Sequence, residues 1–171
     1  ATVCGYEPEF IKIENMAVGG SLILENPPNK KYEGESNHAL INGMGGTINY
    51  QDKSWQGFEA EDLIAIIDLG STKTINAVEV RFLQSQVFWI FLPYHILIEH
   101  SNDGKNYEII YEDFPNNDFS FEQKIISYKT SLDPLESRFI RVKGYNIDQC
   151  LDYHPGAGGP SWIFSDEIII N

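Results

Sequence analysis

The segment YHILIEHSNDGKNYEIIYEDF (residues 94–114) carries the pattern of a β-hairpin. Apolar residues recur at every second position from Tyr94 to Ile98, which places them on one face of a strand. The Asp103-Gly104 pair is typical of a tight hairpin turn, and the run YEIIYEDF that follows supplies the partner strand. The segment therefore predicts two antiparallel strands joined by a short turn.

Similar short runs, rich in β-branched and aromatic residues, recur along the chain, and helical periodicity is almost absent. In INAVEVRFLQ (75–84) the alternation predicts that Val78, Val80 and Phe82 face the core, while Glu79 and Arg81 face outward. The other runs are SLILE (21–25), LIAIIDLG (63–70), EQKIISYKT (122–130), RFIRVKGYN (138–146) and WIFSDEIII (162–170). About eight strands separated by turns predict an all-β fold, an antiparallel β-sandwich.

The 171-residue length predicts a single domain. Residues 1–31 are less patterned and are expected to form an approach segment and an edge strand, and residues 32–171 the sandwich. The chain has neither a signal-peptide pattern nor an apolar run long enough to span a bilayer. Cys4 and Cys150 lack metal-site spacing, and both a disulfide and two free thiols remain open.

The charge balance restricts the class of partner. The chain has 25 acidic and 12 basic residues and a formal net charge of -13. Such a surface repels phosphate backbones and anionic lipid headgroups, which argues against nucleic-acid and membrane binding. It suits cations and neutral polar ligands.

No pattern in the chain indicates catalysis. A GxSxG elbow and HExxH spacing are both absent, and the GAGG run lacks the lysine and helix of a phosphate loop. A glycosidase would need two carboxylates facing each other across a cleft, which a small sandwich hardly offers. The chain is therefore predicted not to be an enzyme.

Two long glycine-rich segments, 37–58 and 146–162, interrupt the strand pattern. Long loops of this kind are usually functional or disordered, and the aromatic residues within these two argue against disorder. The first contains the stretch from Asn42 to Thr47, which can curl around a hard cation but lacks a carboxylate. Asp166 and Glu167 stand between apolar runs in the last strand. Either they face solvent on an edge strand, or Glu167 supplies the missing carboxylate.

Five stretches, in this order, resemble the discoidin (F5/8 type C) domain family, which includes the family 32 carbohydrate-binding modules. They are HALING…T (38–47), FEAEDLIAIIDLGSTKTINAVEVRF (58–82), LPYHILIEHSNDGKNYEII (92–110), SRFIRVKGYN (137–146) and WIFSDEIII (162–170). The resemblance implies a jelly roll of the galactose-binding-domain type. More narrowly, KYEG, WQGF, WIFLP and HPGAGGPSWIFSDEI resemble the accessory modules of bacterial chitobiase or β-N-acetylhexosaminidase enzymes.

The resemblance further implies a structural calcium ion. Asn42 stands where the family has an aspartate, Thr47 matches its threonine and Glu167 its glutamate. Main-chain carbonyls would complete the ligand shell, from Ala39, Met44 and Asp166. The change of aspartate to Asn42 removes one negative charge from the expected site.

The resemblance also implies a sugar site on the loops near the calcium, where an aromatic ring stacks on the apolar face of a pyranose. The candidate residues are Trp55, Trp89 and His154, with Tyr50, Asp52, Gln56, Tyr145 and Asn146 as polar partners. Trp55 is expected to be the exposed platform, and Trp162 is expected in the core. Trp89 is open between platform and core, and His154 between sugar donor and fastener of its turn.

Together these observations predict a non-catalytic, calcium-supported carbohydrate-binding module. It would bind a galactose- or N-acetylhexosamine-type glycan and hold an attached glycoside hydrolase, such as a chitobiase, near its substrate. A secreted, periplasmic or cell-surface bacterial location follows from that role. The alternatives are a protein- or lipid-interaction module, a structural spacer, and a small glycosidase.

Overall fold

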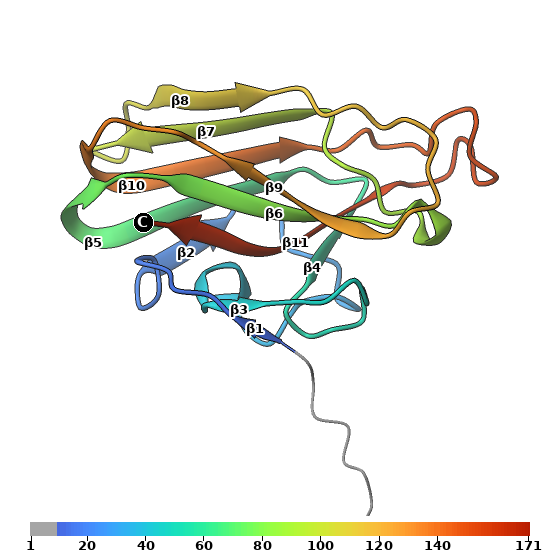
Figure 1. The fold of residues 1–171 in the computed structure, drawn as a ribbon, viewed down its shortest axis with the longest axis horizontal. Helices are drawn as coiled ribbons and strands as arrows, with labels where there is room; N and C mark the ends of the chain where they lie inside the picture. The colour runs from blue at the N-terminus through green and yellow to red at the C-terminus, as the bar shows by residue number, and fades with distance from the viewer. Residues whose placement is uncertain (1–9) are drawn as a thin grey trace, which may run out of the picture.

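A computed structural model describes residues 10–171, which form a two-layered antiparallel β-sandwich (Figure 1). Cys4, and with it the expectation of a disulfide to Cys150, lies outside these residues. The elements in chain order are β1 (Ile11–Lys12), β2 (Ser21–Leu24), the 3-10 helix η1 (Ala39–Ile41), β3 (Met44–Gly45), β4 (Gln56–Glu59), β5 (Leu63–Ile75), β6 (Val78–Gln84), the 3-10 helix η2 (Gln86–Phe88), β7 (His95–Ser101), β8 (Glu108–Asp113), β9 (Lys124–Lys129), β10 (Leu135–Tyr145) and β11 (Trp162–Ile170).

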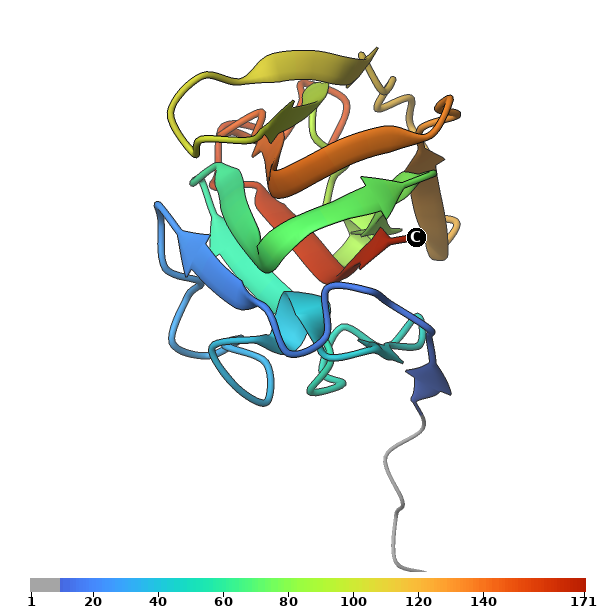
Figure 2. The same ribbon diagram turned by 90° about the vertical axis from the view of Figure 1, so that its left-hand side faces the viewer.

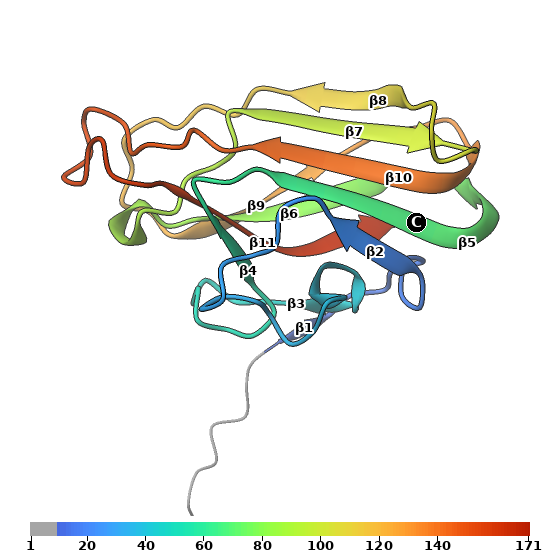
Figure 3. The same ribbon diagram turned by 180° about the vertical axis from the view of Figure 1, so that it is seen from behind.

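The two main sheets pack face to face. One has five strands in the order β2-β5-β10-β7-β8, and it faces the viewer in Figure 3. The other has four strands in the order β4-β11-β6-β9, so the last strand of the chain is an inner strand. A small β1-β3 sheet lies below both layers, as Figure 2 shows from one end of the sandwich. The predicted all-β antiparallel sandwich is confirmed.

The core between the sheets follows from the alternation of side chains along the strands. Val78, Val80 and Phe82 of β6 are fully buried, as predicted. They meet inward-facing residues of the other sheet, among them Ile67 of β5 and Val142 of β10. Burial of this apolar surface is the main contribution to the stability of the sandwich.

The hairpin predicted from residues 94–114 is present as β7 and β8, with Gly104 at a φ of 73°. Tyr94 was expected on the same face of the strand as Ile96 and Ile98, which are both buried. It precedes the strand and is 49% exposed, so this part of the prediction is wrong. The strand pairing begins only at His95, and the chain before it belongs to a loop.

The long loops gather at one end of the sandwich, on the right in Figure 1. This end carries the β3–β4 loop, the β6–β7 segment that contains η2, the β8–β9 loop and the β10–β11 loop. The opposite end has the turns between β5 and β6 and between β7 and β8. Among the described residues, no helix is long and apolar enough to cross a bilayer.

Candidate functional site

A cleft lies at the loop end of the sandwich, between the β3–β4 loop and the segment around η2. Its volume is about 520 Å³, and its lining consists of Ile48, Asn49, Tyr50, Gln51, Phe88 and Gln123. The rings of Tyr50 and Phe88 lie 4.6 Å apart between centroids, and Phe88 is 46% exposed. Two aromatic rings therefore adjoin three amide side chains, without a charged residue in the lining.

An aromatic cluster supports this cleft from below. Tyr32 contacts Tyr50 at 5.7 Å and Trp162 at 5.4 Å between ring centroids, both edge to face. These rings and Phe88 line a smaller cavity of about 110 Å³ that shares Tyr50 and Phe88 with the cleft. Trp162 is half-buried against Phe164, close to its expected place in the core. The cluster fixes the position of Tyr50.

Tyr50 is the one predicted sugar-binding residue that lines this cleft. Phe88 and Gln123 were not predicted, because they lie on the β6–β7 and β8–β9 connections, away from the loop that contains Tyr50. Phe88 directly precedes Trp89, which was the aromatic candidate predicted in this stretch. No local pattern distinguishes the two.

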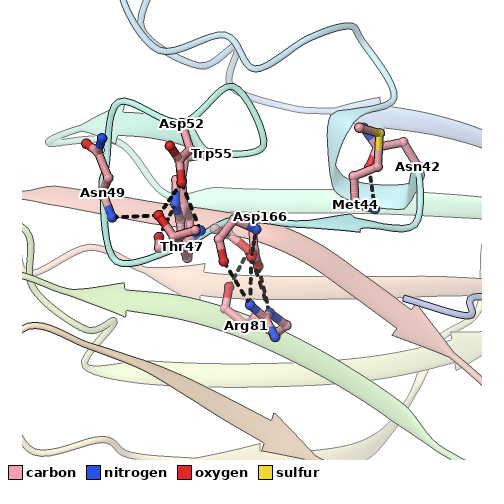
Figure 4. A network of polar contacts seen from close by, with 10 residues as sticks. Asn42, Met44, Thr47, Asn49, Asp52, Trp55, Arg81 and Asp166 are labelled. Atoms are coloured by element: carbon pink, nitrogen blue, oxygen red, sulfur yellow. Dashed lines mark hydrogen bonds and ion pairs between the residues drawn. The ribbon is translucent and has the colours of Figure 1, made fainter. Parts of the chain in front are cut away.

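Trp55 was predicted to be the exposed platform, and this is wrong. It is 1% exposed and packs with Leu83, Ile90 and Phe164. Its indole Nε1 donates a hydrogen bond of 2.8 Å to the carbonyl of Thr47, as Figure 4 shows. Trp55 thus holds the β3–β4 loop through a buried contact, and its ring is not accessible to a ligand.

Three of the predicted polar partners also hold the framework. The buried Gln56 donates through Nε2 to the carbonyl of Glu33 at 2.8 Å. Asn146, likewise buried, donates to the carbonyl of Phe58 at 3.2 Å. Asp52 accepts hydrogen bonds from the backbone N–H and the hydroxyl of Thr47. These hydrogen bonds order the loops, and of the buried polar atoms of these side chains only Oε1 of Gln56 has no partner among the described residues.

Trp89 and His154 belong to a neighbouring pair of loops. His154 is buried, its Nε2 lies 2.6 Å from the carbonyl of Gln86, and its Nδ1 accepts from the N–H of Gly156 at 2.9 Å. Of the two roles considered for His154, the structure favours the one in which its hydrogen bonds hold the turn in place. Trp89 has a φ of 65° and is 36% exposed, and its ring packs closely over Gly156 and Gly159.

Tyr145 lies in a different aromatic group. Its ring stacks on His95 at 5.3 Å, and His95 stacks on Phe114 at 4.4 Å. This group forms where β7 begins and β10 ends. The predicted sugar-binding residues are thus distributed over three places, and only Tyr50 reaches the cleft.

The two carboxylates of the last strand sit in a β-bulge. Ser165 pairs with Phe82 and Ile168 with Val80, so β11 has one residue more than β6 in this interval. Asp166 and Glu167 occupy the bulge, and both are fully buried. The alternative that they face solvent on an edge strand is wrong, since β11 lies between β4 and β6.

Asp166 forms an ion pair with Arg81. Arg81 Nε lies 3.1 Å from Asp166 Oδ1, and Nη2 lies 3.0 Å from Oδ2 (Figure 4). The N–H of Gly46 donates to Asp166 Oδ2 at 2.7 Å. Burial raises the pKa of Asp166, and the guanidinium opposes that shift. Arg81 faces away from the core, as predicted, but the 42–47 loop covers it, so its side chain is only 14% exposed.

Glu167 is held by neutral donors. The N–H of Gly43 donates to Oε2 at 2.5 Å, and Nδ2 of Asn15 donates to the same oxygen at 3.0 Å. Oε1 has no hydrogen-bond partner among the described residues. Burial is the main cause that raises the pKa of Glu167 to about 7, and the nearby Asp166 adds to it.

The other expected calcium ligands have separate protein partners. Asn42 Oδ1 accepts from the N–H of Met44 at 3.0 Å, and Thr47 Oγ1 donates to Asp52, in two groups that Figure 4 shows apart. Ala39 is buried in η1. Residues 10–171 contain no group of three or more His, Cys, Asp or Glu side chains that could hold a metal. In this arrangement the residues do not fit the predicted shell, and calcium binding stays a prediction.

Comparisons with known proteins identify the fold of this chain. No protein-family model matches the sequence, and no curated protein is significantly similar to it. A solved structure, CpGH89CBM32-6 produced by Clostridium perfringens, is 19% identical with a TM-score of 0.56, over 92% of this chain and 98% of that one. The chain has the fold of the family 32 carbohydrate-binding modules.

Two further structures share this module fold. CpGH89CBM32-4 of the same organism, solved with GlcNAc-α-1,4-galactose, is 13% identical with a TM-score of 0.58 over 100% of both chains. A Ruminococcus gnavus GH29 fucosidase is 14% identical with a TM-score of 0.60, over 92% of this chain and 26% of that one. The discoidin-like jelly roll that the resemblance implied is confirmed at the level of the fold.

Proposed function

We propose that this chain is a non-catalytic carbohydrate-binding module and that the cleft between Tyr50 and Phe88 binds a neutral sugar unit. The observation that carries the proposal is the meeting of these two rings with Asn49, Gln51 and Gln123 in one lining. A pyranose has an apolar face that stacks on an aromatic ring. Its hydroxyls need groups that both donate and accept hydrogen bonds, which amides do.

The size and chemistry of the cleft agree with a weak, reversible interaction. One stacked ring and a few hydrogen bonds supply roughly 4 to 8 kcal/mol, which corresponds to millimolar to micromolar affinity. Such affinity suits targeting, in which binding to a glycan raises the effective concentration of an attached enzyme. A pure spacer domain would not need the exposed ring of Phe88. The net charge of -13 would repel anionic lipid headgroups, which argues against a lipid-binding module.

The comparisons support this proposal. One structural neighbour was solved with a disaccharide of GlcNAc and galactose, and the fucosidase that matches is about four times longer than its matching part. By analogy, the ligand is a glycan with galactose or N-acetylhexosamine units. The partner in the same protein is a glycoside hydrolase, and the complex works outside the cytoplasm of a bacterium.

A glycan array with the isolated chain tests the proposal. The best ligand is then titrated into the wild type and into Tyr50→Ala and Phe88→Ala, each of which is expected to weaken binding at least about tenfold, because a stacked ring contributes on the order of 1.4 kcal/mol or more. Tyr94→Ala removes another exposed ring, which contacts Tyr145 and does not line the cleft. Silence on every glycan, or an equal loss for Tyr94→Ala, would contradict the proposal.

A further inference from the structure

The bulge in β11 turns two acidic side chains toward the β3 region, and neither reaches water. Asp166 and Glu167 are each 0% exposed. Burial of a carboxylate is strongly unfavourable unless a cation or several hydrogen-bond donors compensate it. The described residues compensate both oxygens of Asp166 and Oε2 of Glu167, and only Oε1 of Glu167 has no hydrogen-bond partner among them.

Arg81 supplies a cation to one of them. It stands on β6 between Val80 and Phe82, the two residues that flank the bulge, so its side chain emerges opposite the extra residue. The guanidinium lies directly under the loop: a Cβ on Gly45 would come within 3.3 Å of Nη2. Nη2 also donates to the carbonyl of Gly46 at 3.4 Å. One guanidinium thus binds both the carboxylate and the loop backbone.

Asn15 attaches the second carboxylate to the N-terminal segment. Its Nδ2 donates to Glu167 Oε2 at 3.0 Å and to the carbonyl of Ile168 at 2.7 Å. Its Oδ1 accepts from the N–H groups of Ala17 at 3.0 Å and Ile170 at 2.9 Å. A single amide therefore links β11 to the chain that precedes β2.

The backbone of the loop contributes donors in place of acceptors. The N–H of Gly43 points to Glu167 and that of Gly46 points to Asp166. A hard cation in the loop would need oxygen atoms, mostly carbonyls and carboxylates, directed at one point. Here the N–H groups point to the carboxylates, and an arginine fills the place beside the loop. The N–H groups and the guanidinium therefore suit the carboxylates of Asp166 and Glu167 and do not suit a cation.

We propose that Arg81 and the N–H groups of Gly43 and Gly46 close the 42–47 loop onto β11, while Asn15 holds Glu167 from the N-terminal segment, and that this closure takes the place of a structural calcium ion. The domain then keeps its fold without calcium. The proposal concerns the framework and is independent of whether the cleft binds a sugar. It contradicts the calcium site that the family resemblance implies.

Thermal unfolding of the purified chain, followed by circular dichroism in EDTA and in excess calcium chloride, tests the first part. The two melting temperatures are expected to agree within about 2 °C, because an ion that does not bind the native state cannot stabilise it. A rise of about 5 °C or more in calcium would overturn the proposal, since an ion well above its Kd shifts the midpoint by that order. Calorimetric titration with calcium chloride gives an independent reading, with no binding expected.

Variants test the role of Arg81. Arg81→Met is expected to lower the melting temperature clearly, and Arg81→Lys by less, because lysine keeps the charge but not the two parallel contacts. Arg138→Met is the matched control, since Arg138 pairs with Asp68 at 2.8 Å on another strand but is 41% exposed. If Arg81→Met does not fold, the comparison is made with Arg81→Lys and Arg138→Lys. A loss at Arg81 no larger than that at Arg138 would overturn the proposal.

Discussion

Asn15 and Glu167 are 152 residues apart in the sequence, and Asn15 Nδ2 donates a hydrogen bond of 3.0 Å to Glu167 Oε2. The contact joins the N-terminal segment to the bulge of the closing strand. It lies beside the hydrogen bond from the N–H of Met16 to the carbonyl of Ile170. The two ends of the described chain are thus fastened at one place, and the predictions below begin there.

Replacement of Asn15 by alanine is expected to lower the free energy of unfolding by about 2 to 4 kcal/mol. The change removes four hydrogen bonds, one of them to a buried carboxylate, and leaves that carboxylate with fewer donors. Urea unfolding followed by fluorescence measures the effect. Asn116→Ala is a matched control, because Asn116 is exposed. Equal stabilities of the two variants would contradict the role of Asn15.

Glu167 is expected to give the chain a stability that falls as the pH rises. Its folded-state pKa is raised to about 7 from 4.5, so between these values the folded protein holds a proton that the unfolded chain has lost. The contribution is therefore full below pH 4.5 and is lost as the pH rises through 7, on the order of 3 kcal/mol in total. The charged neighbours that set this behaviour are Asp166 and, through it, Arg81.

The measurement compares the wild type with Glu167→Gln by urea unfolding in EDTA at several pH values. The difference in stability between the two proteins isolates this residue from all other titrating groups. As the pH rises from 4.5 to 7, we expect the free energy of unfolding of the wild type to fall relative to that of the glutamine variant, because glutamine does not titrate. A flat difference over this range would show that the folded-state pKa of Glu167 is ordinary.

Gly46→Ala is expected to destabilise the domain by about 1 to 3 kcal/mol, because the added methyl group overpacks a closed site. A Cβ at this position would lie 2.5 Å from Nε1 of Trp55, whose ring cannot retreat from the core. Thermal or urea unfolding measures the loss. Adding Trp55→Phe should make the alanine less harmful, since phenylalanine leaves more space. If the two changes are additive, the contact between Gly46 and Trp55 is not the cause.

Sugar binding in the cleft is expected to depend little on salt. Its lining has three amides and no charged side chain, so ionic screening has no direct contact to weaken. Calorimetric titration of the ligand found on the array, at low and high sodium chloride, is expected to give the same Kd within about twofold. A strong salt dependence would indicate that charged residues outside this cleft bind the ligand.

The sequence alone predicts the fold well because alternation is a local property of a strand. The inward residues Val78, Val80 and Phe82, and the turn at Gly104, are found where the pattern put them. The edge position of β2 also agrees. The failure occurs at Tyr94, because the strand begins only at His95 and the residue before it belongs to a loop. Arg81 keeps its outward place, and the 42–47 loop covers it.

The site is less predictable because its residues meet only through tertiary packing. Tyr50 and Phe88 belong to different connections, and nothing in either stretch indicates the other. Trp55 lies in a polar loop, and its burial depends on the space that Gly46 leaves. The two acidic residues between apolar runs indicated that the last strand is not an ordinary edge strand. Their main partners, Arg81 and Asn15, were not predicted, because they lie on other segments of the chain.

The inner position of β11 has a consequence for how the protein is made. β11 pairs with β4 on one side and with β6 on the other, so the four-stranded sheet cannot form before the ribosome has released residues 162–170. Until then β6 and β9 have an exposed apolar face and an open edge, which are features that promote aggregation. Folding of the domain is thus delayed until the end of its own synthesis. Loss of this last strand would separate β4 from the β6-β9 pair and remove Ile163, Ile168 and Ile170 from the core.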